Sequence, residues 1–162
     1  MTVTLTDPAW RPSSRAPLLW AINAVLLWIP VFVGLVVWLV IAGEWSGWHT
    51  VAFAIAAVLA AVNIGVVPVW RYRVHRWEIS DTAVYTRTGW LLQESRIAPI
   101  TRVQTVDTER GPIDRLLGLA TVTVTTASSA GAVAIEALDL EVAERTAAQL
   151  TEIAAAHKGD AT

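Results

Sequence analysis

The sequence predicts a helical hairpin in the membrane, followed by a mainly-β domain that ends in a helix. Of the 162 residues 54% are hydrophobic and only 16% are charged, which is more apolar than most soluble domains of this size. The apolar excess lies within residues 17–70. From residue 74 onward the continuous apolar run gives way to alternating apolar and polar residues, which is typical of β-strands.

Two apolar segments are long enough to span a bilayer. The first, residues 18–42, has no formal charge, and its length of about 25 residues exceeds the roughly 30 Å of hydrocarbon at 1.5 Å per residue. The second covers residues 51–70. Because residues 43–50 form only a short link, the two segments predict an antiparallel hairpin. A signal peptide is the competing interpretation of the first segment, but that segment is too long and a second span follows it.

The positive charges around the spans predict their orientation. Arg11 and Arg15 precede the first span, Arg71, Arg73 and Arg76 follow the second, and the link contains no Lys or Arg. Under the positive-inside rule both termini lie in the cytoplasm, which predicts a multi-pass protein of the cell membrane. The expected organisation is a cytoplasmic N-terminal tail (1–16), a transmembrane hairpin (17–70), a cytoplasmic domain (71–158) and a tail (159–162).

The part that follows the hairpin predicts a meander of short strands. The candidate strands read HRWEI, AVYTR, WLLQESRIA, ITRVQTVDT, ATVTVTT and AVAIEAL, and turn pairs such as Ser80-Asp81 and Thr88-Gly89 separate the first of them. In the fifth strand Val122 and Val124 share one face and threonines occupy the other. No helix separates the early strands, so an α/β fold is disfavoured.

A C-terminal helix completes the predicted domain. Asp139 is a candidate N-cap, and Lys158-Gly159 supplies a cation and a stop at the other end. One stripe holds its apolar residues Leu140, Ala143, Ala147, Leu150, Ile153 and Ala154. A meander closed by one helix favours a small pleckstrin-homology-like barrel of about six to seven antiparallel strands with a C-terminal helix.

The order of these segments resembles a known family. Two transmembrane helices, the basic juncture WRYRVHRWEIS and the run RIAPITRVQTVDTERGPIDRLLGLATVTVTTAS are similar to the bacterial pleckstrin-homology-like membrane proteins, the YdbS-like group. The resemblance covers nearly everything from residue 18 to about residue 150. It implies a cytoplasmic barrel that associates with related membrane proteins, and it implies no catalytic residues.

The segment GPIDRLLGL, residues 111–119, is a candidate protein-binding site with two open interpretations. It can form one helical turn after Pro112, with Ile113, Leu116 and Leu117 packed over one end of the barrel. Alternatively, part of it stays exposed and forms a docking patch, together with Trp90 and Leu91, for a membrane surface or a partner protein.

Arg71, Arg73 and Arg76 are candidate contacts to the lipid surface. Chain connectivity places them beside the second span, where an anionic leaflet attracts basic side chains. The alternative is that they only fix the topology. A clustered Lys/Arg loop, as phosphoinositide recognition requires, is not visible in the sequence.

Catalysis and nucleic-acid binding are disfavoured. The chain has no cysteine and three widely separated histidines, and no metal-spaced cluster, phosphate-binding loop or nucleophile elbow occurs. The formal net charge is −2, which disfavours nucleic acid. We therefore predict no enzyme activity, no cofactor, no metal site and no small-molecule substrate. The leading hypothesis is a non-catalytic binding module that is a subunit of a membrane complex with related proteins; the alternative is direct binding of the anionic inner-leaflet lipid surface.

Overall fold

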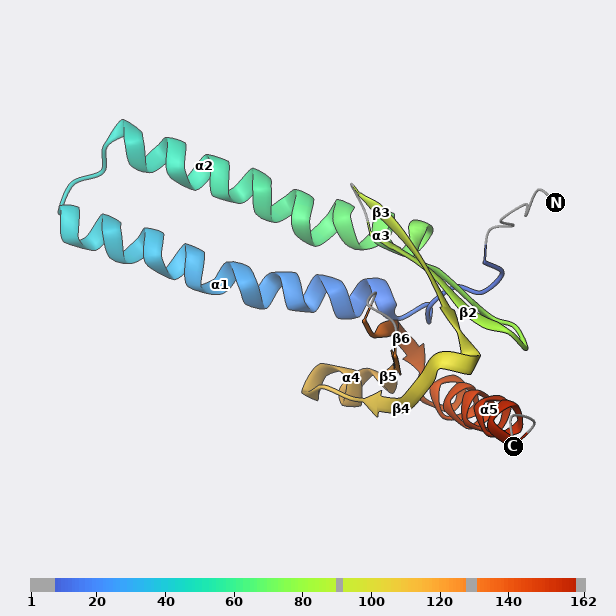
Figure 1. Ribbon diagram of the computed structural model, residues 1–162. Helices are drawn as coiled ribbons and strands as arrows, with labels where there is room; N and C mark the ends of the chain where they lie inside the picture. The colour runs from blue at the N-terminus through green and yellow to red at the C-terminus, as the bar shows by residue number, and fades with distance from the viewer. Residues whose placement is uncertain (1–7, 90–91, 128–130, 160–162) are drawn as a thin grey trace. The chain divides into compact units, whose positions relative to one another are not determined.

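The computed structural model describes residues 8–89, 92–127 and 131–159 (Figure 1). The chain forms two compact units. One is Pro17–Trp70, and the other combines the described parts of Met1–Ala16 with those of Arg71–Thr162.

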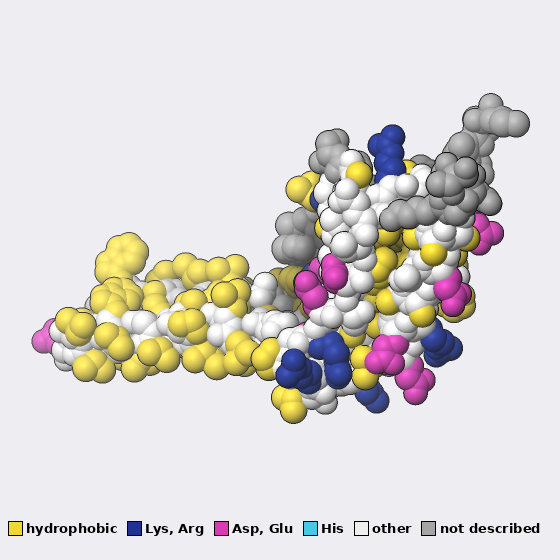
Figure 2. All heavy atoms as spheres, turned by 60° about the horizontal axis from the view of Figure 1, so that its bottom comes forward, with side chains coloured by type: hydrophobic (Ala, Val, Ile, Leu, Met, Phe, Trp, Pro, Cys, Tyr) yellow, Lys and Arg dark blue, Asp and Glu magenta, His cyan; other side chains and the backbone are white. Residues whose placement is uncertain are grey.

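The first unit consists of long apolar helices. They are α1 (Ala16–Ala42), α2 (Gly47–Ala61), the π-helical turn η1 (Val62–Val66) and α3 (Val67–Val74), which continues into the second unit. Two continuous helical stretches, Ala16–Ala42 and Gly47–Val74, are long and apolar enough to cross a membrane. Hydrophobic side chains cover their surface (Figure 2), and Ile41 is 80% exposed. Such an apolar surface is favourable in lipid and unfavourable in water, so both stretches are candidate membrane spans.

The second unit is mainly β, as predicted. It contains β1 (Arg76–Ile79), β2 (Ala83–Gly89), β3 (Gln93–Pro99), β4 (Val103–Glu109), β5 (Leu119–Thr126) and β6 (Val133–Asp139), with the 3₁₀ turn η2 (Ile100–Arg102) between β3 and β4. The short helix α4 (Pro112–Leu117) connects β4 to β5, and α5 (Leu140–Gly159) ends the domain. The strands and the closing helix confirm the predicted fold class.

The strands do not close into one hydrogen-bonded barrel. Within the described residues they form two antiparallel sheets, ordered β1-β2-β3 and β4-β5-β6. The break falls between β3 and β4, because Pro99 has no N–H and η2 turns the chain out of the first sheet before β4 begins. The expected pleckstrin-homology-like barrel is therefore an open pair of sheets.

The core lies between the two sheets and α5. Val122 and Val124 are fully buried, whereas the threonines between them are half-buried, so the alternation in β5 is confirmed. The predicted stripe on α5 contributes buried Ala143 and Leu150. The helix packs against η2 and the second sheet (Figure 1), where it removes this apolar stripe from water.

The residues before α1 belong to the β domain. The backbones of Trp10 and Trp77 exchange two hydrogen bonds, of 3.0 and 2.9 Å. The Ser13 N–H donates to the Ala137 carbonyl (2.9 Å), and the Ser13 hydroxyl donates to Asp139 Oδ1 (2.7 Å). Residues 8–16, which the sequence analysis assigns to a tail, are thus hydrogen-bonded to β1 and to the end of β6.

Candidate binding surfaces

The three arginines proposed as lipid contacts have different surroundings. Arg71 Nη2 lies 2.8 Å from Oε2 of Glu136, and the two side chains are 32% and 38% exposed. Arg73, in the last turn of α3, is exposed. Arg76 is half-buried, and its Nε is buried with no hydrogen-bond partner among the described residues. The juncture is therefore not one uniform basic patch, and Arg73 presents the most accessible of the three charges.

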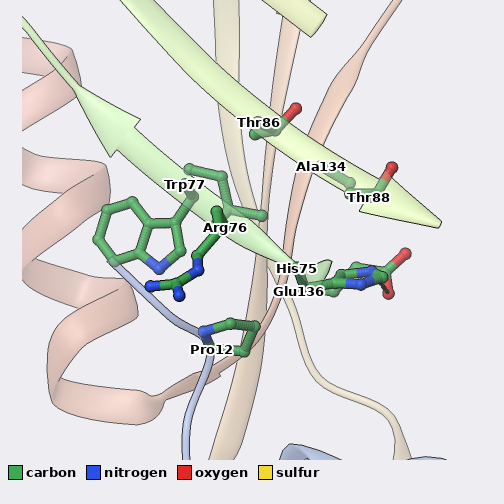
Figure 3. A pocket seen from close by; sticks show the side chains of 9 residues that line it. Pro12, His75, Arg76, Trp77, Thr86, Thr88, Ala134 and Glu136 are labelled. Atoms are coloured by element: carbon green, nitrogen blue, oxygen red, sulfur yellow. Dashed lines mark ion pairs between the residues drawn. The ribbon is translucent and has the colours of Figure 1, made fainter. Parts of the chain in front are cut away.

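His75 is buried between these charged groups (Figure 3). Its Nδ1 lies 2.9 Å from the Arg71 carbonyl oxygen, so Nδ1 carries the proton that is donated. Its Nε2 lies 4.0 Å from Glu136 Oε2. Burial, followed by the Arg71 charge, lowers the pKa of His75 from its ordinary 6.5, while Glu136 and the backbone hydrogen bond oppose this shift. His75 is therefore neutral at neutral pH.

The cavity beside His75 does not fit a ligand. It measures about 10 Å³ and is lined by residues of β1, β2 and β6 together with Pro12 (Figure 3). This is about the room that one water molecule needs, far below the several hundred Å³ of small-molecule sites. We interpret the His75 cluster as a structural feature of the juncture.

The segment after β4 forms the predicted helical turn. Pro112 occupies the first turn of α4, where its missing N–H costs nothing, and the Gly111 N–H donates to Asp114 Oδ2 at 2.8 Å. The helix ends at Gly118, whose φ of +68° favours glycine.

The three apolar side chains of this segment differ in burial, and docking through it stays a prediction. Ile113 and Leu117 are half-buried, as the packed interpretation requires. Leu116 is 86% exposed, as the docking interpretation requires. The expected packing of all three side chains is wrong for Leu116, because its position on this short helix faces away from the sheet.

Arg15 makes a contact to α4 that the sequence did not indicate. Its Nη1 donates to the Leu117 carbonyl oxygen at 2.9 Å. A helix leaves its last carbonyls without intrahelical partners, and a guanidinium there also interacts favourably with the helix dipole. No sequence pattern could have revealed this contact, because the acceptor is a backbone atom 102 residues away in the chain.

The other proposed docking residues fall between β2 and β3 in the sequence. Trp90 and Leu91 lie outside the described residues. The next residue, Leu92, is 87% exposed, and Ile97 on β3 is 51% exposed. Exposed apolar side chains therefore occur at the start of β3 and near its end.

The outer edge of β3 presents backbone groups that β2 does not use. The Ile100 N–H donates to the Thr82 carbonyl oxygen at 2.9 Å. Hydrogen-bonded and non-hydrogen-bonded pairs alternate in an antiparallel ladder, so the pair of Ile97 with Tyr85 is a non-hydrogen-bonded pair. The N–H and C=O of Ile97 point outward, and β3 is an edge strand among the described strands.

A groove follows this edge where the two sheets fail to close. Its volume is about 340 Å³, and residues of β3 and of the adjoining ends of β5 and β6 line it. Arg96 crosses it, since its Nη1 donates to the Ala132 carbonyl oxygen (3.1 Å) and its Nε pairs with Glu94 Oε1 (2.8 Å). The groove is lined by both charged and apolar side chains.

Comparison with known proteins agrees with this architecture. The model of the family described as "Bacterial PH domain" matches residues 18–154. The chain belongs to the bacterial PH domain family. It is also 30% identical over 112 residues to the UPF0699 transmembrane protein YdbS of Bacillus subtilis (strain 168), which covers 68% of this chain and 69% of that protein. No solved structure matches the chain significantly.

Membership of the bacterial PH domain family indicates a membrane-associated binding module. The chain is thus a membrane protein with transmembrane helices and a PH domain. Among the residues that the structure describes, no group of three or more His, Asp or Glu could hold a metal ion. The β3 edge is the surface that the structure adds to those proposed from sequence, which are the arginines and the exposed leucine of α4.

Proposed function

We propose that this chain is a multi-pass protein of the cell membrane whose PH domain joins it, without catalysis, to another membrane protein that carries a related domain. Both termini lie in the cytoplasm in this proposal, because the arginines flank the two spans on that side and the link has none. The family and the transmembrane relative support the membrane location and the binding role.

The outer edge of β3 is the observation that carries the proposal. An extended segment of a partner can add to such an edge, so that main-chain hydrogen bonds provide affinity and side-chain contacts provide specificity. The N–H and C=O of Ile97 point outward, and about half of the residue is exposed, so both the backbone and the side chain can contact a partner strand. Trp90 and Leu91, which precede this strand in the sequence and lie outside the described residues, remain candidate contacts. The charged Glu94–Arg96 pair lies on the same strand. Charged side chains on an edge strand oppose unspecific pairing with the strands of other chains.

Substitution of Ile97 tests this proposal. Ile97→Pro removes the outward N–H and leaves the hydrogen bonds of β3 to β2 intact, because a proline is tolerated where the N–H of an edge strand faces solvent. The full-length chain is purified in mild detergent from its native membrane, and co-eluting proteins are identified by mass spectrometry. We expect one stoichiometric membrane partner, retained by Ile97→Val and lost by Ile97→Pro.

A partner that stays bound to a folded Ile97→Pro variant excludes the β3 edge as the contact. A chain that elutes alone in every case excludes the complex itself. Circular dichroism of the purified variant distinguishes a lost edge from a lost fold.

Direct lipid binding is the second candidate function, and the exposure of Arg73 favours it. If Arg73 contacts anionic head groups, Arg73→Gln reduces the anionic lipid that native mass spectrometry detects on the detergent-purified protein. Arg102, which is exposed on η2, provides the matched control as Arg102→Gln. Equal losses from both variants point to unspecific charge attraction.

A further inference from the structure

We propose that α4 is an anchor at the membrane interface: Leu116 enters the lipid between head groups, while Arg15 and Arg115 face the phosphates. The occupant of this surface is the phospholipid bilayer itself. The sequence alone left a membrane surface and a protein partner open for Leu116, and the contact between Arg15 and α4 is what favours lipid. The inference deepens direct lipid binding, the second candidate function. The inference does not depend on the protein partner proposed for the β3 edge.

The first step is the position of Arg15 in the chain. It directly precedes Ala16, the first residue of α1, and the uncharged apolar segment starts at residue 18. The hydrocarbon layer is about 30 Å thick and the bilayer with head groups about 40–45 Å, so each head-group layer measures roughly 5–8 Å. A residue this close to the start of a span lies in or beside that layer.

The second step is that Arg15 also contacts α4 directly. Its guanidinium bonds the Leu117 carbonyl oxygen at 2.9 Å. The approach is close, since a Cβ on Gly118 would lie 3.4 Å from Arg15 Nη1. Consecutive Cα atoms are about 3.8 Å apart, so the Leu116 side chain lies within roughly 10 Å of that guanidinium. Covalent connectivity therefore keeps α4 within reach of the interface.

The third step is the chemistry that α4 presents there. Leu116 is 86% exposed, whereas Ile113 and Leu117 on the same helix are half-buried. The neighbouring Arg115 is exposed, and so is Arg15. A guanidinium has five N–H donors, so Arg15 can bond the Leu117 carbonyl and a phosphate oxygen together. An apolar side chain flanked by arginines matches a surface of lipid tails and phosphates.

The absence of cysteine from the sequence makes this proposal directly measurable. Leu116→Cys and Leu92→Cys each create a single labelling site in the full-length chain, for an environment-sensitive fluorophore in anionic proteoliposomes. Leu92 is the matched control, because it is 87% exposed and lies on the β2–β3 hairpin, whereas the hydrogen bond of the Arg15 guanidinium goes to α4. Lipids with a nitroxide near the head group quench fluorophores at the interface, and iodide quenches those in water.

We expect the label at residue 116 to be quenched by the nitroxide lipids at least about threefold more than the label at residue 92, and to be protected from iodide, as burial of a leucine-sized group in lipid implies. Adding Arg15→Gln to Leu116→Cys should remove most of this difference. Equal lipid quenching at both positions, or quenching that is unaffected by Arg15→Gln, overturns the proposal. Protection from iodide that persists in lipid-free detergent also overturns it, since it indicates a protein contact.

Discussion

His75 links the stability of the domain to pH at the scale of a single residue. Its folded pKa is lower than 6.5 because of burial and Arg71, so the unfolded chain binds this proton more readily than the folded one. The stabilising contribution is complete above about pH 6.5 and is lost as the pH falls from there toward the folded pKa. We expect the thermal midpoint of the full-length chain in detergent to decrease as the pH is lowered from about 7.5 to about 5.5. The decrease should be smaller for His75→Gln.

Glu136 provides the control for this prediction. Its carboxylate raises the pKa of His75, so Glu136→Gln should lower the midpoint of the His75 titration that NMR measures. The ion pair with Arg71 itself contributes less than about 1 kcal/mol, because both side chains are about one-third exposed. A His75 midpoint that rises in Glu136→Gln contradicts the assignment of charges around the imidazole.

Residue-level features also show what the sequence could not reveal. Ala137 has a φ of +54° and is fully buried, at the point in β6 where its carbonyl accepts the Ser13 N–H. A glycine would have signalled such a conformation, but an alanine does not. The predicted burial of Val122 and Val124, by contrast, follows from local alternation alone, which is why it is confirmed.

At the scale of elements, the end of α4 depends on one glycine. Gly118 has a φ of +68° and terminates the helix. Gly118→Ala forces an L-residue into the left-handed region, and we expect a loss of about 1–2 kcal/mol in the free energy of unfolding, measured by denaturant titration. Gly118→Asn should lose clearly less, because asparagine tolerates this conformation. Equal losses from the two variants indicate that space beside Arg15, rather than backbone conformation, is limiting.

The segment 8–16 is an element that the sequence analysis did not assign to the domain. Buried Ser13 bonds both Ala137 and Asp139. Ser13→Ala removes a hydrogen bond to a carboxylate, and we expect the thermal midpoint to fall by an amount equivalent to about 1–2 kcal/mol. Ser14→Ala is the matched control at an exposed neighbouring position. If both variants melt like the parent chain, the segment does not stabilise the domain.

The elements differ in how well the sequence predicted them, and the difference has a physical cause. Strands, spans and α5 depend on local periodicity, so their residues carry the signal themselves. The contacts of Trp10 with Trp77 and of Arg15 with Leu117 join distant segments through backbone atoms. These atoms are the same at every residue, so the residue type at that position gives no signal of the contact. The two sheets stay separate because Pro99 and η2 interrupt the chain between β3 and β4. The alternating sequence pattern runs through both strands and does not show this interruption of strand pairing.

At the scale of the whole molecule, the division into two units reflects two solvents. The Pro17–Trp70 unit exposes its apolar side chains, whereas the domain buries them between two sheets and α5. Composition alone separates these parts, because a helix that spans lipid needs an uninterrupted apolar run and a strand that borders water needs alternation. The sequence therefore carries a strong local signal for the end of the membrane part, and no comparable signal for the surface of the domain that binds.

The orientation of the whole molecule can be tested through its lack of cysteine. Glu44, in the link between α1 and α2, and Glu152, on α5, are both exposed and provide single-cysteine sites as Glu44→Cys and Glu152→Cys. Since the basic residues flank the spans on the side of the domain, we expect a membrane-impermeant maleimide to label residue 44 in intact cells and residue 152 only after the cells are opened. The reverse pattern places the domain outside the cytoplasm and excludes a contact between its PH fold and the inner leaflet. Labelling of both sites in intact cells shows that α1 and the stretch from α2 to α3 do not form a hairpin with both ends on one side.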